Sequence, residues 1–511
     1  MATPATTVTH VSHLLTSTQN NPSGTAVISA QGSITWTELE ARGHKVAHAL
    51  RAEGLEIGDR WAFLCDNRLE WPELFLGNTL AGTKYVPLNW HLTVPELVYL
   101  LQNSGATFLI VDQRNEKNGR EAAGEVGITS DRIIVVGDTY DAWRDAQPST
   151  EFECTVTGSA LLYTGGTTGA SKGVVRADAG IPFPAWLTGV TNWGAFVRMP
   201  EQGVCYIATP LYHAFGTGVL QACFGRNHTL VIKERFDIDQ FLDDVETYGV
   251  TSAPMVPTLM VRLAKLDDSV FSQRTLTSLQ WITHTAAPCP PWAKQRLIDL
   301  FGPIVVEFYG SSEGTGPVVC TSQEWMDRPG TVGKPAPILK ASVVDDNGND
   351  LPPGEIGTLY FLREGGAPQY YGDEAKTNSS RLPDGRFTVG DLGYMDADGF
   401  IYLVDRRVDL ILSGGSNIYP AEIEGVISQH PAVKDVAVFG IPHVEFGQEV
   451  KAAIEVEPGH SVTESELISW CKERLASFKC PKSVDFHDAL PREAHGKLKK
   501  RYLRDAYWPA T

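Results

Sequence analysis

Residues 163–173, YTGGTTGASKG, are rich in glycine and hydroxyl side chains and end in a lysine followed by a glycine. Glycine lets the backbone approach a ligand and present its N–H groups, while threonine hydroxyls and a lysine ammonium suit phosphate oxygens. The stretch is not a Walker P-loop, because G-x-x-x-x-G-K-[ST] occurs nowhere in the chain. We expect a phosphate-binding loop, and a flexible surface linker is the alternative.

Three further stretches concentrate carboxylate, hydroxyl and cationic groups: residues 307–316 (EFYGSSEGTG), residues 389–424 and residues 491–500 (PREAHGKLKK). The first of them ends an apolar strand with hydroxyl groups and the carboxylate of Glu313. A carboxylate beside phosphates makes physical sense through a hard cation such as Mg²⁺. An exposed loop glutamate is the alternative interpretation.

Serine hydrolysis is a weaker alternative for the same residues. Residues 310–314 and 169–173 both fit G-x-S-x-G, with Ser312 and Ser171 as the central serines. A nucleophile elbow needs a helix directly after its serine. The residues that follow the first match, TGPVVC, are typical of a loop and a strand.

Elements of the α/β type must position these groups. From about residue 26, short apolar runs alternate with segments of helical periodicity. A capping box at Thr37–Glu40 is expected to open the first long helix, after a hairpin over residues 26–36. Strands are expected within residues 60–66, 203–210, 250–256, 279–288 and 304–310. Such repetition predicts doubly wound sheets with helices on both faces.

The pattern changes near residue 330 to strands joined by Asn-Gly and Asp-Gly turns, which predicts a small barrel-like β subdomain. A small α+β segment follows residue 409. At 511 residues the chain is too long for one core. We therefore expect an N-terminal domain over residues 1–405 and a smaller C-terminal domain over residues 406–511, with the boundary between Asp405 and Asp409.

Composition restricts the partners of the protein. The hydrophobic fraction of 42% and the charged fraction of 20% are ordinary for a globular chain, and a net charge of −18 argues against nucleic acid. Eight scattered cysteines without a C-x-x-C pair indicate reduced thiols. The N-terminus has no basic signal, and no apolar run approaches the roughly 18 residues that span a membrane. We expect a cytoplasmic protein without a membrane span, and a homodimer is left open.

Together the four stretches resemble the core motifs of the adenylate-forming enzymes, which include acyl-CoA synthetases, peptide-synthetase adenylation domains and luciferases. The resemblance spans nearly the whole chain, and the motifs occur in the family's order. Residues 413–424, SGGSNIYPAEIE, have the form typical of CoA ligases. The resemblance implies a small-molecule carboxylic acid, ATP and coenzyme A as substrates, and Mg²⁺ as a cofactor.

The resemblance also assigns a nucleotide site. The family's phosphate loop is usually T-S-G-T-T-G-x-P-K-G, and here Gly165 and Ser171 replace its serine and proline. The loop hydroxyls and its lysine would bind the β and γ phosphates, the adenine would stack on a tyrosine, and an aspartate with an arginine would bind the ribose. The implied residues are Thr164, Gly165, Gly166, Thr167, Thr168, Gly169, Lys172, Ala286, Ala287, Pro288, Glu307, Phe308, Tyr309, Gly310, Ser311, Ser312, Asp391 and Arg406.

Two further positions carry implied roles beside the nucleotide. Glu313, with Ser312 where threonine is usual, matches the family's magnesium-binding pair. His213, in PLYHAFG, matches the position at the mouth between the acid and CoA. A structural histidine at the end of an apolar strand is the alternative for His213.

Lys497 matches the family's P-x-x-x-x-G-K pattern and would bind the substrate carboxylate and the α-phosphate. The segment has Arg-Glu-Ala-His where threonine and serine are common. Three more cations follow, namely Lys499, Lys500 and Arg501, and we expect them to form a solvated face.

The resemblance further implies that the C-terminal domain rotates between two half-reactions. Rotation would withdraw Lys497 and bring Ser413, Gly414 and Gly415 against the site as a wall of the pantetheine tunnel. Val408 occupies the position where many members carry Asp or Lys as the pivot, so Asp409 is the alternative pivot.

The implied activity is that of an AMP-forming acid–CoA ligase. Residues 255–266 and 288–303 resemble bacterial bile-acid, steroid-acid and fatty-acid CoA ligases, which favours a bulky apolar acid. An aryl-acid CoA ligase and an adenylating enzyme without CoA are the alternatives. Candidate residues of the acid pocket are Trp186, Trp193, Phe215, Thr217 and His284.

Overall fold

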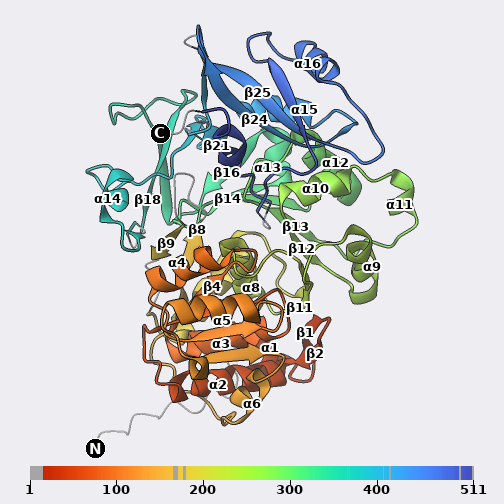
Figure 1. The fold of residues 1–511 in the computed structure, drawn as a ribbon. Helices are drawn as coiled ribbons and strands as arrows, with labels where there is room; N and C mark the ends of the chain where they lie inside the picture. Colours follow the sequence, from red (N-terminus) through yellow and green to blue (C-terminus); the bar gives the residue numbers. More distant parts are fainter. Residues whose placement is uncertain are drawn as a thin grey trace, which may run out of the picture.

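The computed structural model describes residues 15–164, 171–175, 180–364, 366–367, 369–406, 408–413, 416–493 and 496–508. Figure 1 shows a large N-terminal body and a smaller C-terminal body, drawn in blue, that covers one end of it. The N-terminal body is built from stacked layers of sheet and helix.

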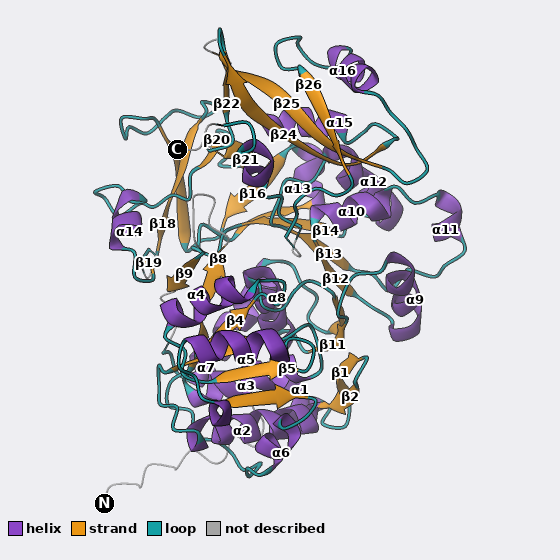
Figure 2. Ribbon diagram, in the orientation of Figure 1, coloured by secondary structure: helices purple, strands orange, loops and turns teal. Residues whose placement is uncertain are grey.

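The first sheet of the N-terminal body is parallel, with strand order β6-β5-β3-β4-β7. Side chains alternate between its faces, so Trp61 and Phe63 join one buried cluster while Ala62 and Leu64 join another. Helices cover both faces (Figure 2), which explains the nearly continuous apolar strands. The elements are β3 (Arg60–Leu64), β4 (Lys84–Leu88), β5 (Leu109–Asp112), β6 (Ile133–Val136), β7 (Ser159–Ala160), α1 (Thr16–Asn20), α2 (Trp36–Ala52), α3 (Glu70–Ala81), α4 (Val94–Ser104), α5 (Glu116–Glu125) and α6 (Tyr140–Asp145).

The capping box of α2 lies two residues earlier than predicted. Thr35 is the N-cap, and its side chain accepts a hydrogen bond from the backbone N–H of Glu38. Glu38 in turn accepts from the Thr35 backbone. The predicted N-cap, Thr37, instead donates its hydroxyl to the Pro22 carbonyl. The helix begins at Trp36, directly after the N-cap Thr35, and the Trp36 indole is buried in the core at 3% exposure.

The second sheet runs through the centre of the molecule. Its strands from β1 to β14 are parallel, and β2 pairs with β1 in antiparallel register at its end. Cys205 and Ile207 share the core cluster of Trp61 and Phe63, so this sheet and the first sheet enclose a common apolar layer. The elements are β1 (Thr25–Ser29), β2 (Gly32–Thr35), β10 (Gly203–Ile207), β11 (His228–Ile232), β12 (Ser252–Met255), β13 (Trp281–His284), β14 (Val305–Tyr309), α7 (Phe183–Phe196), α8 (Ala214–Gly225), α9 (Ile238–Tyr248), α10 (Pro257–Ala264), α11 (Asp268–Ser272) and α12 (Pro291–Phe301).

The predicted β subdomain is continuous with this sheet, because antiparallel strands extend it beyond β14 in the order β15-β16-β21-β20-β18-β17. A separate short sheet, β19-β9-β8, stands beside it. The elements are β15 (Val318–Thr321), β16 (Thr331–Pro335), β17 (Leu339–Val344), β18 (Gly357–Arg363), β20 (Asp391–Met395), β21 (Ile401–Arg406), β8 (Leu162–Thr164), β9 (Lys172–Val175), β19 (Gln369–Tyr370), α13 (Ser322–Asp327) and α14 (Glu374–Ser379).

The C-terminal body has its own sheet and its own buried cluster. Its central hairpin pairs β24 with β25 in antiparallel register, and β26 joins β25 in parallel. The elements are β22 (Ile411–Ser413), β23 (Ser416–Ile418), β24 (Val433–His443), β25 (Gly447–Val456), β26 (Ser483–His487), α15 (Pro420–Ile427), α16 (Glu464–Lys472) and α17 (Lys500–Arg504). Among the helices of the described ranges, none is long and apolar enough to cross a membrane.

Candidate active site

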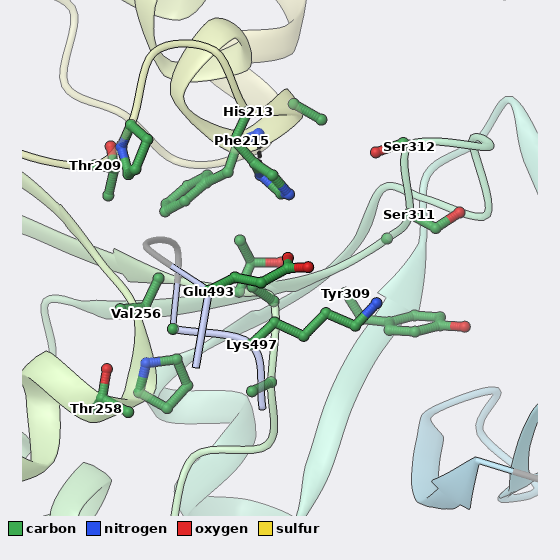
Figure 3. Close-up of a pocket in the computed structure, with 18 of the residues that line it drawn as sticks. Thr209, His213, Phe215, Val256, Thr258, Tyr309, Ser311, Ser312, Glu493 and Lys497 are labelled. Carbon is green, nitrogen blue, oxygen red and sulfur yellow. Dashed lines mark hydrogen bonds between the residues drawn. The ribbon is translucent and has the colours of Figure 1, made fainter. Parts of the chain in front are cut away.

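A cavity of about 3420 Å³ opens between the N-terminal and C-terminal bodies. Its walls include the ends of β13 and β14, the start of α8 and the segment that carries Lys497. Figure 3 shows His213 and Phe215 on one side of this space and Lys497 and Glu493 on the other. Residues far apart in the sequence therefore meet here.

The predicted phosphate loop connects β8 to β9, which pair in antiparallel register with Thr164 opposite Lys172. The loop residues Gly165, Gly166, Thr167, Thr168 and Gly169 lie outside the described residues. Lys172 forms an ion pair with Asp373, with 2.5 Å between Nζ and Oδ2. Its ammonium is thus held at the edge of the cavity by a carboxylate.

A hydrogen-bonded chain joins the predicted adenine and ribose residues. The hydroxyl of Tyr309, the last residue of β14, donates to Asp391 Oδ2 over 2.6 Å. Arg406 Nε lies 3.4 Å from Asp391 Oδ1, because Asp391 and Arg406 are opposite each other in the β20–β21 pair. Burial and the neighbouring carboxylate raise the pKa of Tyr309, so its hydroxyl stays a donor. These two contacts fix the orientation of all three side chains.

Residues 285–288 form the turn after β13, and Ala286, Ala287 and Pro288 line the cavity. Ala286 has a φ of 77°, a left-handed conformation that is rare for a residue with a Cβ. Strained backbone of this kind is concentrated at functional sites. The turn and Tyr309 line the same cavity.

Glu307 lies on β14 and is one end of a buried ion pair. Lys294 Nζ lies 2.7 Å from Glu307 Oε2, and His284 Nε2 lies 3.7 Å from the same oxygen. Burial alone would raise the pKa of Glu307, but Lys294 and His284 bring it below its usual value. Burial lowers the pKa of His284 to about 4, so this ring is neutral. The pair anchors α12 to the strand beneath the site.

Glu313 lines the cavity and accepts a hydrogen bond from the Tyr370 hydroxyl over 3.2 Å. Tyr370 belongs to β19, which pairs with β9, so Glu313 is tied to the strand that carries Lys172. Mg²⁺ is usually bound in proteins by one or two carboxylates together with phosphate oxygens and water. Glu313, with the hydroxyl of Ser312 beside it, fits this donor set.

Lys497 extends into the cavity toward Tyr309 (Figure 3). A tight turn holds it, because the Glu493 backbone N–H donates to the Lys497 carbonyl over 2.8 Å. Burial and the charge of Arg406 lower the pKa of Lys497, while Glu493, Glu313 and Asp391 oppose the shift. The structure thus brings Lys497 into the same charged environment as the metal and ribose candidates.

His213 is the N-cap of α8, and its Nδ1 accepts from the Phe215 backbone N–H over 3.4 Å. A neutral imidazole that accepts at Nδ1 carries its proton on Nε2. The ring faces the Lys497 side of the cavity in Figure 3. His213 therefore has a structural role as the N-cap of α8, and it also lines the cavity.

Of the three residues predicted to wall a pantetheine tunnel after domain rotation, the structure describes only Ser413. Ser413 pairs with Gly447 at the end of the C-terminal sheet and does not line the cavity. Gly414 and Gly415 lie outside the described residues. Val408, the predicted pivot position, is half exposed at 49%.

The prediction of a solvated face after Lys497 is wrong for Lys500. Its Nζ lies 2.8 Å from Glu424 Oε1, and the two side chains are only 14% and 21% exposed. Lys499 Nζ lies 3.3 Å from Glu493 Oε1, while Arg501 is 42% exposed and pairs with Asp505. The segment folds against α15, so one cation of the run is turned inward.

Aromatic side chains dominate the cavity wall beyond His213. Trp193 and Phe215 both pack edge-on against Phe308, at ring distances of 5.6 Å and 5.5 Å. Trp186 and Thr217 also line the cavity, whereas His284 is fully buried behind it. Four of the five predicted pocket residues thus reach this space.

The polar residues of the site that were not predicted include Tyr370, Asp373 and Glu493. No sequence motif marks Tyr370 or Asp373, whose positions depend on the pairing of β19 with β9. Glu493 could have been found, because it replaces a residue that is usually neutral in the segment before Lys497.

Comparisons with known proteins find similar sequences along nearly the whole chain. Residues 14–371 match the model of the AMP-binding enzyme family, and residues 422–497 match the model of the AMP-binding enzyme C-terminal domain. The chain is 31% identical over 499 residues to the fatty acid–[acyl-carrier-protein] ligase ScoC of Streptomyces coeruleorubidus, covering 96% of this chain and 95% of that protein. It is 33% identical over 488 residues to the 2-succinylbenzoate–CoA ligase of Bacillus licheniformis, covering 94% and 97%.

The crystal structure of ATP-bound MatB from Rhodopseudomonas palustris superposes with a TM-score of 0.83 at 29% identity, covering 96% of both chains. This likeness confirms the predicted α/β architecture of a large N-terminal domain with a smaller C-terminal domain.

Proposed function

The chain belongs to the AMP-binding enzyme family as an ATP-dependent acid–CoA ligase, and we propose that its acid is bulky and apolar. The aromatic wall formed by Trp193, Phe215 and Phe308 is the observation that carries this proposal. Large apolar side chains around a cavity favour ligands that bury apolar surface. The polar groups are gathered at one end, where a carboxylate would be activated.

We assign the first half-reaction to the positive charges around Lys497. A carboxylate oxygen attacks the α-phosphorus of ATP, the bond to the β-phosphate breaks, and pyrophosphate leaves with the displaced electron pair. Lys497 and Arg406 would stabilise negative charge on the α-phosphate and carboxylate, and Lys172 would bind the leaving phosphates. Mg²⁺, held by Glu313 and Ser312, would neutralise further charge on the phosphates.

The nucleoside is oriented by the chain of Tyr309, Asp391 and Arg406. Asp391 accepts from Tyr309 through one oxygen and pairs with Arg406 through the other, so the carboxylate is held in place before the nucleotide binds. Ribose hydroxyls would donate to this carboxylate. Such preorganisation reduces the entropy lost on binding.

The second half-reaction transfers the acyl group to sulfur. The CoA thiolate attacks the acyl carbon, the bond to the AMP oxygen breaks, and AMP leaves. We propose that the C-terminal domain turns about the residues after Arg406 between the two steps. Ser413 lies away from the cavity while Lys497 lies in it, which supports a change of orientation between the steps.

The test is a panel of steroid, fatty, aryl and short acids with ATP and CoA. We expect AMP, pyrophosphate and acyl-CoA in equal amounts. We also expect kcat/KM to be higher for acids that fill the pocket, because each buried methylene stabilises the transition state by about 1 kcal/mol. If acetate is turned over as efficiently as larger acids, the proposed preference for a bulky acid is refuted.

If the products are ADP and phosphate, the adenylate mechanism is refuted. Replacing CoA by a pantetheinylated carrier protein tests the acceptor, since one relative is named for that substrate.

A further inference from the structure

Helix α10 contacts the C-terminal body at both of its ends. At its start, Gly496 packs so closely that a Cβ there would lie 3.1 Å from Val256 and 3.2 Å from Thr258. At its end, the C-cap residue Lys265 donates from Nζ to the Val433 carbonyl over 2.7 Å. The first contact is next to Lys497, and the second lies about one helix length away.

Lys265 binds both strands of the C-terminal hairpin. Val433 is the first residue of β24, and Glu457 directly follows β25. Lys265 Nζ lies 3.5 Å from Glu457 Oε2, so one ammonium bridges a carbonyl and a carboxylate. The Trp292 indole N–H donates to Ser428 Oγ over 3.5 Å, which adds a weaker contact between the same two bodies.

We propose that Lys265 is a positioning residue that holds the C-terminal domain in the orientation in which Lys497 enters the cavity. The proposal rests on the ligase function proposed above. Two separated contacts on one rigid helix fix a rotation better than one, because a single contact leaves the domain free to pivot. Lys265 binds Val433 and Glu457 of the C-terminal domain, which also carries Lys497. It therefore acts on the reaction through the position of Lys497.

The contact should be weak enough to break, because the C-terminal domain must leave this orientation before the second half-reaction. Lys265 and Glu457 are 28% and 33% exposed, so solvent weakens their attraction. The hydrogen bond from an ammonium to a carbonyl is stronger than a neutral one. We expect loss of the lysine to shift the orientation equilibrium about tenfold, enough to slow one half-reaction without abolishing it.

The experiment compares the two half-reactions in Lys265→Met. Adenylation is followed as pyrophosphate release from ATP and free acid, and thioester formation is followed from synthetic acyl-AMP and CoA. We expect adenylation to fall about fivefold to tenfold, while thioester formation keeps its rate or rises. Equal loss in both assays, or no change in adenylation, would overturn the proposal.

Lys434→Met is the matched control. Lys434 is the neighbour of Val433 and pairs with Glu455 inside the C-terminal domain, so this ion pair does not join the two domains. It should leave the ratio of the two rates unchanged. Lys265→Arg keeps a cation and should recover most of the adenylation, and thermal unfolding of each variant shows whether the fold is intact.

The two proposals can fail separately. If the unaltered enzyme forms no AMP with any acid, the proposed ligase function fails. If it forms acyl-CoA normally but Lys265→Met slows both half-reactions equally, only the positioning role fails.

Discussion

Tyr309 and Asp391, 82 residues apart in the sequence, share a hydrogen bond of 2.6 Å from the phenol to the carboxylate. The bond spans from the last residue of β14 to the first residue of β20, across the β15–β16–β21 part of the sheet. It places a flat aromatic ring and a carboxyl group at one edge of the cavity. A base and a sugar need such neighbours.

Asp391→Ala should raise KM for ATP by about 30-fold, because the nucleotide loses charge-assisted hydrogen bonds to a preoriented carboxylate. KM for the acid should change little. Tyr309→Phe removes only the hydroxyl and should have a smaller effect on KM for ATP. Tyr402→Phe is its control, since that hydroxyl bonds Asp396 away from the cavity. Steady-state kinetics at varied ATP would contradict the assignment if KM for ATP stayed constant in Asp391→Ala.

Lys497→Ala should lower adenylation by several orders of magnitude, the scale expected when a positioned charge is lost from a transition state. Thioester formation from synthetic acyl-AMP should survive nearly intact. Arg501→Ala, an exposed neighbour paired within its own helix, should affect neither step. Equal loss in both assays would assign Lys497 to folding or domain docking.

Adenylation should decline on the alkaline side at a pH below the ordinary lysine pKa of about 10.4, because burial and Arg406 lower the pKa of Lys497. Glu493 opposes this shift. Glu493→Gln removes a negative charge that favours the ammonium, so the pKa of Lys497 falls further and the alkaline limb moves to lower pH. The pH profile of kcat for pyrophosphate release measures this. Glu473→Gln alters an exposed carboxylate that pairs with Arg474, and it should leave the limb in place.

Lys500→Met should reduce the free energy of unfolding by about 2 kcal/mol, because it leaves the Glu424 carboxylate buried without its cation. Urea unfolding measures the change, with Arg501→Ala as the exposed control. The double variant Lys500→Met with Glu424→Gln should recover part of the loss. A loss no larger than that of Arg501→Ala would mean that the inward ion pair contributes nothing to stability.

The sequence could identify groups that lie at the ends of strands, because short motifs there keep their order in the chain. Tyr309 and Asp391 were found in this way, in motifs that resemble those of a known family, and the sheet brings them to one cavity. Lys497 was found from a motif as well, although it lies in the loop before α17, and the C-terminal body brings it to the cavity. It could not identify partners that depend on packing between distant elements. The Lys294–Glu307 pair requires α12 to lie on β14, and the inward turn of Lys500 requires the last segment to lie on α15. Thr35 and Thr37 each precede a glutamate by three residues, so the sequence could not decide which of the two threonines caps α2.

Asp373 gives Lys172 a negatively charged partner whenever no phosphate is present. On the proposed function, incoming ATP must compete with this carboxylate, which weakens nucleotide binding. The same competition assists the departure of pyrophosphate, because the Lys172 ammonium can pair again with Asp373 when pyrophosphate leaves. Asp373 also caps α14, so it stays in place while Lys172 exchanges one anion for the other. The carboxylate thereby limits product inhibition, and an enzyme that lacked it would hold pyrophosphate longer after each turnover.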